Sequence, residues 1–138
     1  MSLSGTWYNE LGSEMHVEQD GSSVSGTYRT GVGHAPGEYA LVGLTDAKPL
    51  PRSQALAFVV VWSNGSRGAS ATSWSGQYQT IDGEETITAT WLLTLETVPN
   101  ADWSSTIVGV DVFTRRKPPE ETIARRARQS TWSHPAVA

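Results

Sequence analysis

Residues 87–96 read ITATWLLTLE, an alternation of apolar side chains with mostly hydroxyl-bearing ones. Successive side chains of a β-strand point to opposite faces, so residues two apart share a face. Ile87, Trp91 and Leu93 therefore lie on one apolar face, while threonines occupy most of the other. The alternation predicts a β-strand with one face buried in a protein core.

The same short alternation recurs along the chain, in segments rich in Val, Thr, Tyr and Trp that glycine or proline separates. On this basis we predict eight strands, at residues 5–9, 13–19, 23–30, 38–44, 55–62, 69–78, 85–95 and 104–114. Asp-Gly pairs at 20–21 and 82–83 and an Asn-Gly pair at 64–65 mark turns, because such pairs accept the positive φ of tight hairpins. Eight strands joined by short turns can close around one small ligand. The predicted fold is all-β, an eight-stranded antiparallel up-and-down β-barrel, with a β-sandwich as the competing architecture.

Composition limits the classes of function. The chain has 138 residues, of which 38% are hydrophobic, which is enough for one domain with one core. A net charge of −4 and a pI near 5.3 provide no basic surface for nucleic acid or anionic lipid. No apolar run approaches the roughly 20 residues that cross a bilayer. From the charge and the short apolar runs we expect neither nucleic acid nor a membrane as partner. Because the chain lacks cysteine, it has no disulfide, thiolate metal ligand or cysteine nucleophile.

Aromatic and polar residues are predicted on the same inner face. Four tryptophans follow one another at intervals of about one strand and turn, at Trp62, Trp74, Trp91 and Trp103. Ser70 and Thr72 share the face of Trp74, and Asp111 shares that of Ile107. A buried carboxylate needs hydrogen-bond donors, and aromatic walls with a few polar groups are typical of a pocket for a small ligand.

The opposite face of the last predicted strand is apolar as well. Val108, Val110 and Val112 point outward, and Val59 and Val61 extend this surface. Water does not favour a row of exposed β-branched side chains. The row therefore predicts an interface between subunits.

Several motifs resemble the avidin and streptavidin family. They are GTWYNELGS at residues 5–13, GTY at 26–28, WSGQY at 74–78, TWLL at 90–93 and TIVGVDVFT at 106–114. The resemblance implies a biotin-binding β-barrel at residues 3–116. The tail at residues 117–138 is then a short helix or disordered.

The resemblance also implies a role for each polar residue of the site. The ureido oxygen of biotin accepts hydrogen bonds from Asn9, Ser13 and Tyr28, much as an oxyanion is held by preorganised donors. The two ureido N–H groups donate to Asp111 and Thr30. A buried carboxylate is tolerated there because the ligand and neighbouring groups donate to it.

The remaining site residues are implied in the same way. Trp62, Trp74 and Trp91 enclose the sulfur-containing ring near Thr72, and Leu93 closes the apolar wall. Ser70 and the backbone near His34 face the valerate carboxylate. Leu11 and Val32 complete the predicted biotin site. Residues 30–36 form a glycine-containing flap over the ligand.

Trp103 has a separate implied role. In tetrameric members of the family its counterpart covers the pocket of a neighbouring subunit, so the resemblance implies a homotetramer in which Trp103 is lent to a neighbour. We also expect a secreted protein whose signal peptide is not part of this sequence.

An enzyme and a carrier of another ligand are the two alternative classes of function. An enzyme would need a nucleophile, base or metal set, and the sequence has no HExxH or GxSxG motif. We therefore predict no catalytic residues, no metal site and no cofactor, with biotin as a ligand only. A lipocalin-like carrier of another small hydrophobic ligand is the alternative, and it predicts an apolar interior without a polar cluster at one end.

The tail has two features of its own. Residues 120–129 have helical composition, with Ile123 and Ala127 four positions apart. Residues 132–135 read WSHP, which resembles the core of tag peptides that occupy the biotin pocket of streptavidin. One hypothesis is that the tail enters a pocket as a weak internal ligand, and the alternative is a solvated tail.

Overall fold

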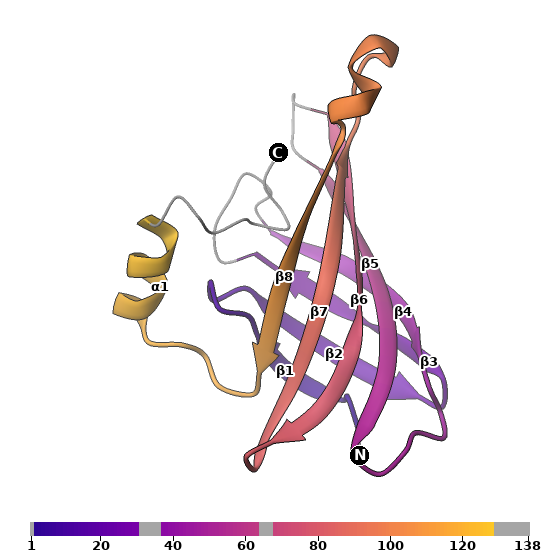
Figure 1. Cartoon of the computed structure of the whole chain (residues 1–138), viewed down its shortest axis with the longest axis vertical. Helices are drawn as coiled ribbons and strands as arrows, with labels where there is room; N and C mark the ends of the chain where they lie inside the picture. Colours follow the sequence, from indigo (N-terminus) through magenta and orange to yellow (C-terminus); the bar gives the residue numbers. More distant parts are fainter. Residues whose placement is uncertain (1, 31–36, 64–67, 129–138) are drawn as a thin grey trace.

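The computed structural model describes residues 2–30, 37–63 and 68–128. Eight antiparallel strands follow one another around a closed barrel in chain order (Figure 1). The strands are β1 (Gly5–Tyr8), β2 (Glu14–Asp20), β3 (Ser23–Arg29), β4 (Glu38–Thr45), β5 (Ser53–Ser63), β6 (Ala69–Ile81), β7 (Glu84–Leu95) and β8 (Thr106–Thr114). The predicted barrel is confirmed, and the competing sandwich is wrong.

The turns follow from residues that accept positive φ. Asp82 and Gly83 have φ of 50° and 80° and join β6 to β7, as the Asp-Gly pair predicts. Gly21, at φ 61°, lies in the predicted turn between β2 and β3. The predicted turn at 64–65 lies outside the described residues. β8 begins two residues later than predicted, because Pro99–Ser104 forms the 3-10 helix η2.

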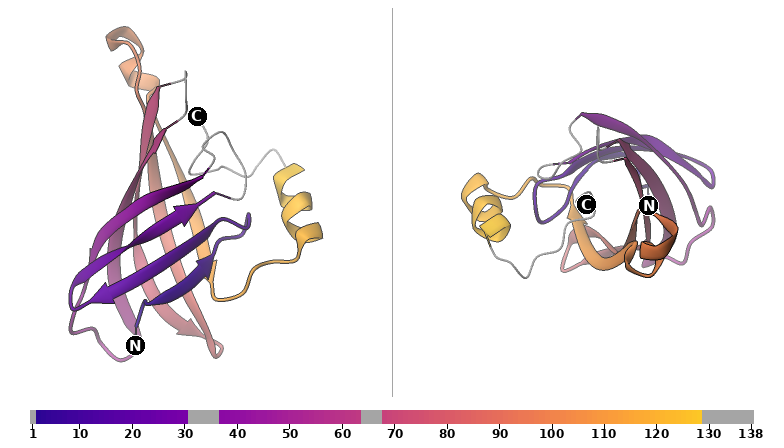
Figure 2. Two further views of the ribbon diagram at one scale, coloured as in Figure 1. Left: turned by 180° about the vertical axis from the view of Figure 1, so that it is seen from behind. Right: turned by 90° about the horizontal axis from the view of Figure 1, so that it is seen from above.

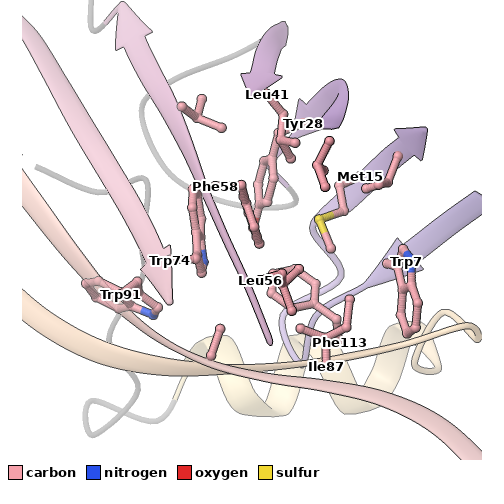
Figure 3. Packing of buried hydrophobic residues seen from close by; sticks show 14 of the residues in the cluster. Trp7, Met15, Tyr28, Leu41, Leu56, Phe58, Trp74, Ile87, Trp91 and Phe113 are labelled. Carbon is pink, nitrogen blue, oxygen red and sulfur yellow. The ribbon is translucent and has the colours of Figure 1, made fainter. Parts of the chain in front are cut away.

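Strand register places the aromatic residues side by side inside the barrel. Phe58 of β5 is the register partner of Trp74 of β6, which in turn is the partner of Trp91 of β7. Figure 3 shows Tyr28, Phe58 and Trp74 gathered in the interior, with Trp91 beyond them. The same register leaves alternate residues outside, which agrees with the alternation read from the sequence.

The seam that closes the barrel is short. β1 and β8 share a single register pair, Tyr8 with Thr114, whereas β7 and β8 pair from Thr86 to Thr94. β1 has four residues and β8 has nine, so most of β8 lies beyond the end of β1. On the side of β8 that faces β1, most backbone groups near Asp111 therefore have no register partner in β1.

Helix α1 (Glu120–Arg128) follows β8 and lies outside the barrel wall (Figure 2). Glu120 and Glu121 occupy its first turn and three arginines its last, an arrangement that the helix dipole favours. Its one buried side chain is Ile123. The tail prediction allowed a short helix here, and the described part of the tail contains one.

Candidate ligand-binding site

Asp111 lies at the centre of a buried polar cluster. Its side chain is 0% exposed on the inner face of β8. Trp74 Nε1 donates a 2.9 Å hydrogen bond to Oδ2, and Asn9 Nδ2 donates to Oδ1 at 3.4 Å. The carboxylate therefore has the donors that burial requires, from β6 and from the β1–β2 loop.

Asn9 is oriented by the loop in which it lies. Its Oδ1 accepts from the backbone N–H of Leu11 at 3.0 Å and of Ser13 at 2.8 Å. Gly12 completes the loop at φ 80°, a conformation that favours glycine. Because the amide oxygen is used by the loop, the amide nitrogen is directed at Asp111 and at Tyr28 Oη, 3.5 Å away. The loop thus presents a donor to the interior.

Tyr28 supplies a second donor beside it. The phenol is fully buried, and burial raises its pKa well above 10.0, with the charge of Asp111 adding to the effect. A hydrogen bond with the Ser13 side chain acts in the opposite direction. Tyr28 therefore stays protonated at neutral pH. Three predicted ureido donors, Asn9, Ser13 and Tyr28, lie together with Asp111.

Aromatic rings enclose this cluster. Tyr28 stacks on Trp74 with ring centroids 5.2 Å apart and meets Trp62 edge to face at 5.4 Å. Phe58 stacks on Trp74 at 4.7 Å. Trp62 is fixed by a 2.8 Å hydrogen bond from Nε1 to Thr72 Oγ1. The rings are thus held by one another and by a hydroxyl of the adjacent strand.

Trp91 depends on a glycine of the next strand. Its register partner on β8 is Gly109, and a Cβ at Gly109 would lie 2.2 Å from Trp91 Cζ2. No side chain other than hydrogen fits at that position with the indole in place. The motif GVDVF therefore has a packing reason for its glycine.

The structure places most predicted site residues together in the interior. The buried ones are Asn9, Leu11, Ser13, Tyr28, Trp62, Ser70, Thr72, Trp74, Trp91, Leu93 and Asp111. Thr30, the residue after β3, is half-buried. Trp103 lies apart from them in η2 and is 88% exposed. Val32 and His34 lie outside the described residues, as does most of the predicted flap.

Two neighbours of the cluster were missed by the sequence predictions. Glu10 follows Asn9, and its Oε2 accepts a 3.0 Å hydrogen bond from the backbone N–H of Val112 on β8. Its Oε1 is buried. Tyr39 packs edge to face on Trp62 at 5.1 Å. Tyr39 lies two positions before the buried Leu41 on β4 and so shares its inner face, which could have indicated its place in the interior. No sequence signal joins Glu10 to β8.

Glu10 affects the ionisation of Asp111. Burial is the main cause that raises the pKa of Asp111 well above its ordinary 3.8, and the nearby Glu10 carboxylate raises it further. Hydrogen bonds from Trp74 and Asn9 lower it. A like charge nearby disfavours the ionised form of a buried carboxyl group. Asp111 therefore takes up a proton more readily than an exposed aspartate does.

Other features of the surface do not reproduce this chemistry. A groove of about 730 Å³ lies outside the barrel, between β8 and the segment that includes α1. It is lined by exposed valines and charged side chains and borders Asn9 and Glu10, but Asp111 is not among its lining residues. Across the described ranges, no group of three or more His, Asp or Glu residues is placed to hold a metal ion. The helices in those ranges are also too short and polar to cross a membrane.

A closed antiparallel barrel with a buried polar cluster and stacked aromatic walls has the architecture of a small-molecule-binding barrel. The carrier alternative predicted an apolar interior, and the cluster around Asp111 disfavours it.

Comparison with known proteins gives the family. The model of the Avidin family matches residues 1–116, so the chain belongs to the avidin family. Avidin-related protein 4/5 of Gallus gallus is 34% identical over 119 residues, which cover 83% of this chain and 77% of that protein. Avidin of Gallus gallus is 31% identical over 127 residues, with 87% and 82% covered. Fibropellin-1 of Strongylocentrotus purpuratus is 31% identical over 119 residues, which are 82% of this chain and 11% of that protein.

Proposed function

We propose that this protein binds biotin non-covalently and with high affinity inside its barrel. Membership of the avidin family supports the ligand. The observation that carries the proposal is the buried Asp111 carboxylate, held by Trp74 and Asn9 beside the phenol of Tyr28. A cyclic urea has one acceptor and two donors, and the cluster offers groups complementary to both.

Each ureido group has a proposed partner. Asn9 Nδ2, the Ser13 hydroxyl and the Tyr28 hydroxyl donate to the ureido oxygen. Asp111 and Thr30 accept from the two N–H groups. The support for this arrangement is that the loop fixes the Asn9 amide and that burial keeps Tyr28 protonated. Preorganised donors in a buried site are worth more than the same donors in water.

The apolar part of biotin has proposed partners as well. The ring lies against the indoles near Thr72, and Leu11 and Leu93 complete the apolar wall. Ser70 and the segment with Val32 and His34 face the valerate carboxylate. The apolar contacts follow the usual composition of small-ligand pockets, in which a few polar groups fix the orientation.

For the assembly we propose a homotetramer in which Trp103 covers the pocket of a neighbouring subunit. Trp103 is 88% exposed in one chain, which is unusual for so large an apolar side chain. The predicted valine row, from Val108 to Val112 on β8 with Val59 and Val61 on β5, is exposed as well. Burial of these surfaces between subunits accounts for both. We further propose that the protein is secreted and has no catalytic activity.

Biotin titration followed by tryptophan fluorescence tests the proposed ligand. We expect stoichiometric quenching at one biotin per chain, and Asp111→Ala is expected to weaken binding strongly. Thr90→Ala, on the outer face of β7, is the matched control and is expected to bind as the unchanged protein does. Absence of binding at micromolar biotin would contradict the proposal.

The mass in solution tests the assembly. Light scattering after size-exclusion chromatography is expected to give four chains. Trp103→Ala is expected to shorten the lifetime of bound biotin without changing the fold of the barrel. A monomeric mass with an unaltered lifetime would contradict the proposed exchange of Trp103.

A further inference from the structure

Helix α1 is attached to the loop that carries the polar cluster. Ile123 is the buried side chain of the helix, and it lies against Gly12 of the β1–β2 loop. A Cβ at Gly12 would lie 2.6 Å from Ile123 Cδ1, so the isoleucine fills the space that the glycine leaves. The contact joins segments more than 100 positions apart in the chain.

Arg126 forms the second attachment. Its Nη1 donates a 2.8 Å hydrogen bond to the backbone carbonyl oxygen of Glu10, and the side chain is partly buried. Hydrogen bonds from a charged donor are stronger than neutral ones. Ile123 and Arg126 are three positions apart, so both lie on one face of the helix. That face holds the loop at two successive points, Glu10 and Gly12.

The rest of the helix is less closely supported. The groove of about 730 Å³ is lined by Thr122 of the helix on one side and by Val110 and Val112 of β8 on the other, and the attached Arg126 also borders it. This space separates that part of α1 from the outer face of β8. The attachment at the loop is therefore a main contact of the helix with the barrel.

The attachment extends from Glu10 to β8. Beyond the single β1–β8 register pair, the Glu10 carboxylate accepts from the backbone N–H of Val112, the residue after Asp111. The side chain thus continues the barrel seam where β1 has ended. On its other side Glu10 is followed by Leu11 and then Ser13, whose N–H groups orient Asn9.

We propose that α1 is a brace for the ligand-binding loop, in which Ile123 and Arg126 are positioning residues. They hold residues 9–13 and the adjacent part of β8 in the conformation that presents Asn9 and Asp111 to the ligand. The brace acts through preorganisation, because a loop already held in its bound conformation loses less freedom when the ligand binds. This inference rests on the proposed biotin site, and neither residue contacts the ligand.

Hydrogen exchange in the ligand-free full chain tests the brace independently of biotin. The N–H groups of Leu11 and Ser13 are bonded to Asn9 Oδ1, so their exchange rates report the order of the loop. We expect Arg126→Ala and Ile123→Ala to accelerate their exchange, and Arg126→Lys to restore part of the protection. Arg125→Ala and Arg128→Ala remove the same charge from exposed positions of the helix and are expected to change nothing.

Biotin dissociation rates provide the second readout. With the brace removed, we expect dissociation to accelerate by up to about tenfold, because the worth of one charge-assisted hydrogen bond sets the upper limit of the effect. The matched variants at Arg125 and Arg128 are expected to stay within about twofold of the unchanged protein. Measurement well below the unfolding temperature separates positioning from a general loss of stability.

The outcomes are distinct. Unchanged exchange of Leu11 and Ser13 together with an unchanged dissociation rate in Arg126→Ala would overturn the brace. If Ile123→Ala does not fold, Arg126→Ala and Arg126→Lys still test whether α1 orders the loop. Failure of the unchanged protein to bind biotin would remove the proposed function, whereas the exchange measurement would still test whether α1 orders the loop.

Discussion

Trp74 and Asp111 are joined across strand β7, with the indole Nε1 of β6 donating a 2.9 Å hydrogen bond to Oδ2 of the carboxylate on β8. The carboxylate is thus held in place by a side chain of the protein. One tryptophan both forms part of the aromatic wall and orients the principal charged group of the site.

Removal of this hydrogen bond is expected to weaken biotin binding. Trp74→Phe retains an aromatic ring but no N–H, so Asp111 loses its shortest donor. A hydrogen bond to a charged group contributes about 1.5–3 kcal/mol, which corresponds to roughly 10- to 100-fold in the dissociation constant. Competition titration at pH 8 and pH 5 measures it. Because Trp74 lowers the pKa of Asp111, the loss should be larger at pH 5, and an equal loss at both pH values would contradict this role.

Glu10→Gln is expected to extend biotin binding to lower pH. Burial and then Glu10 raise the pKa of Asp111, and the ionised form is the better acceptor for a ureido N–H. Loss of the Glu10 charge lowers that pKa toward 3.8, so the pH at which binding weakens on acidification moves downward. The amide oxygen can still accept from Val112. Affinity measured from pH 8 to pH 4 checks the shift.

The same substitution has a stability counterpart with a defined sign. The raised pKa of Asp111 in the folded state contributes stability that is full below 3.8 and is lost as pH rises through the raised value. In Glu10→Gln the pKa of Asp111 is raised less, so less of this stability is lost at pH 7. Without biotin, the unfolding temperature of Glu10→Gln relative to that of the unchanged protein should therefore be higher at neutral pH than at acid pH. A constant difference across this range would exclude the proposed coupling.

Gly109→Ala is expected to displace Trp91. The added Cβ would lie 2.2 Å from the indole, and an overpacked core of this kind costs about 1–3 kcal/mol. Both the unfolding temperature and the affinity for biotin should fall, because the indole is part of the proposed site. Unchanged biotin affinity in Gly109→Ala would mean that Trp91 is not part of the biotin site.

Tyr78→Phe is expected to reduce stability without altering biotin binding. Tyr78 Oη donates a 2.5 Å hydrogen bond to Glu85, and burial followed by this bond raises the pKa of Tyr78 to about 12. The bond also lowers the pKa of Glu85 from 4.5. Since Glu85 is solvent-accessible, we expect a loss of no more than about 1 kcal/mol near pH 7.

The pH dependence of this effect distinguishes it from loss of packing. A lowered carboxyl pKa contributes stability that is present above 4.5 and is lost as pH falls through the lowered value. The difference between Tyr78→Phe and the unchanged protein should therefore shrink on acidification. Chemical denaturation at pH 7 and pH 3 measures it, and an equal difference at both would indicate packing alone.

Much of the interior could be predicted because it depends on local alternation. Period-two patterning placed Trp74 and Asp111 on inner faces, and the structure confirms both positions. Burial along a strand was less predictable. Ile107 shares its predicted face with Asp111 yet is 45% exposed, because it lies near the start of β8, beside η2, where the barrel ends.

The contacts of Glu10 could not be predicted from local patterning. Glu10 meets Val112 across 102 positions and Arg126 across 116, and neither distance leaves a periodic signal in the sequence. The orientation of the Asn9 amide likewise depends on the closed conformation of its loop. Such groups are found once the barrel has closed and the distant segments lie together.

Strand β8 places its carboxylate and its exposed valines on alternate residues, Asp111 inside and Val110 and Val112 outside. Insertion or deletion of one residue within β8 before Asp111 would exchange the two faces, so that valines would point into the barrel and the carboxylate would point to the surface. Changes of length in this part of the chain are therefore compatible with the site only in the loops, and β8 has to evolve by substitution at constant length.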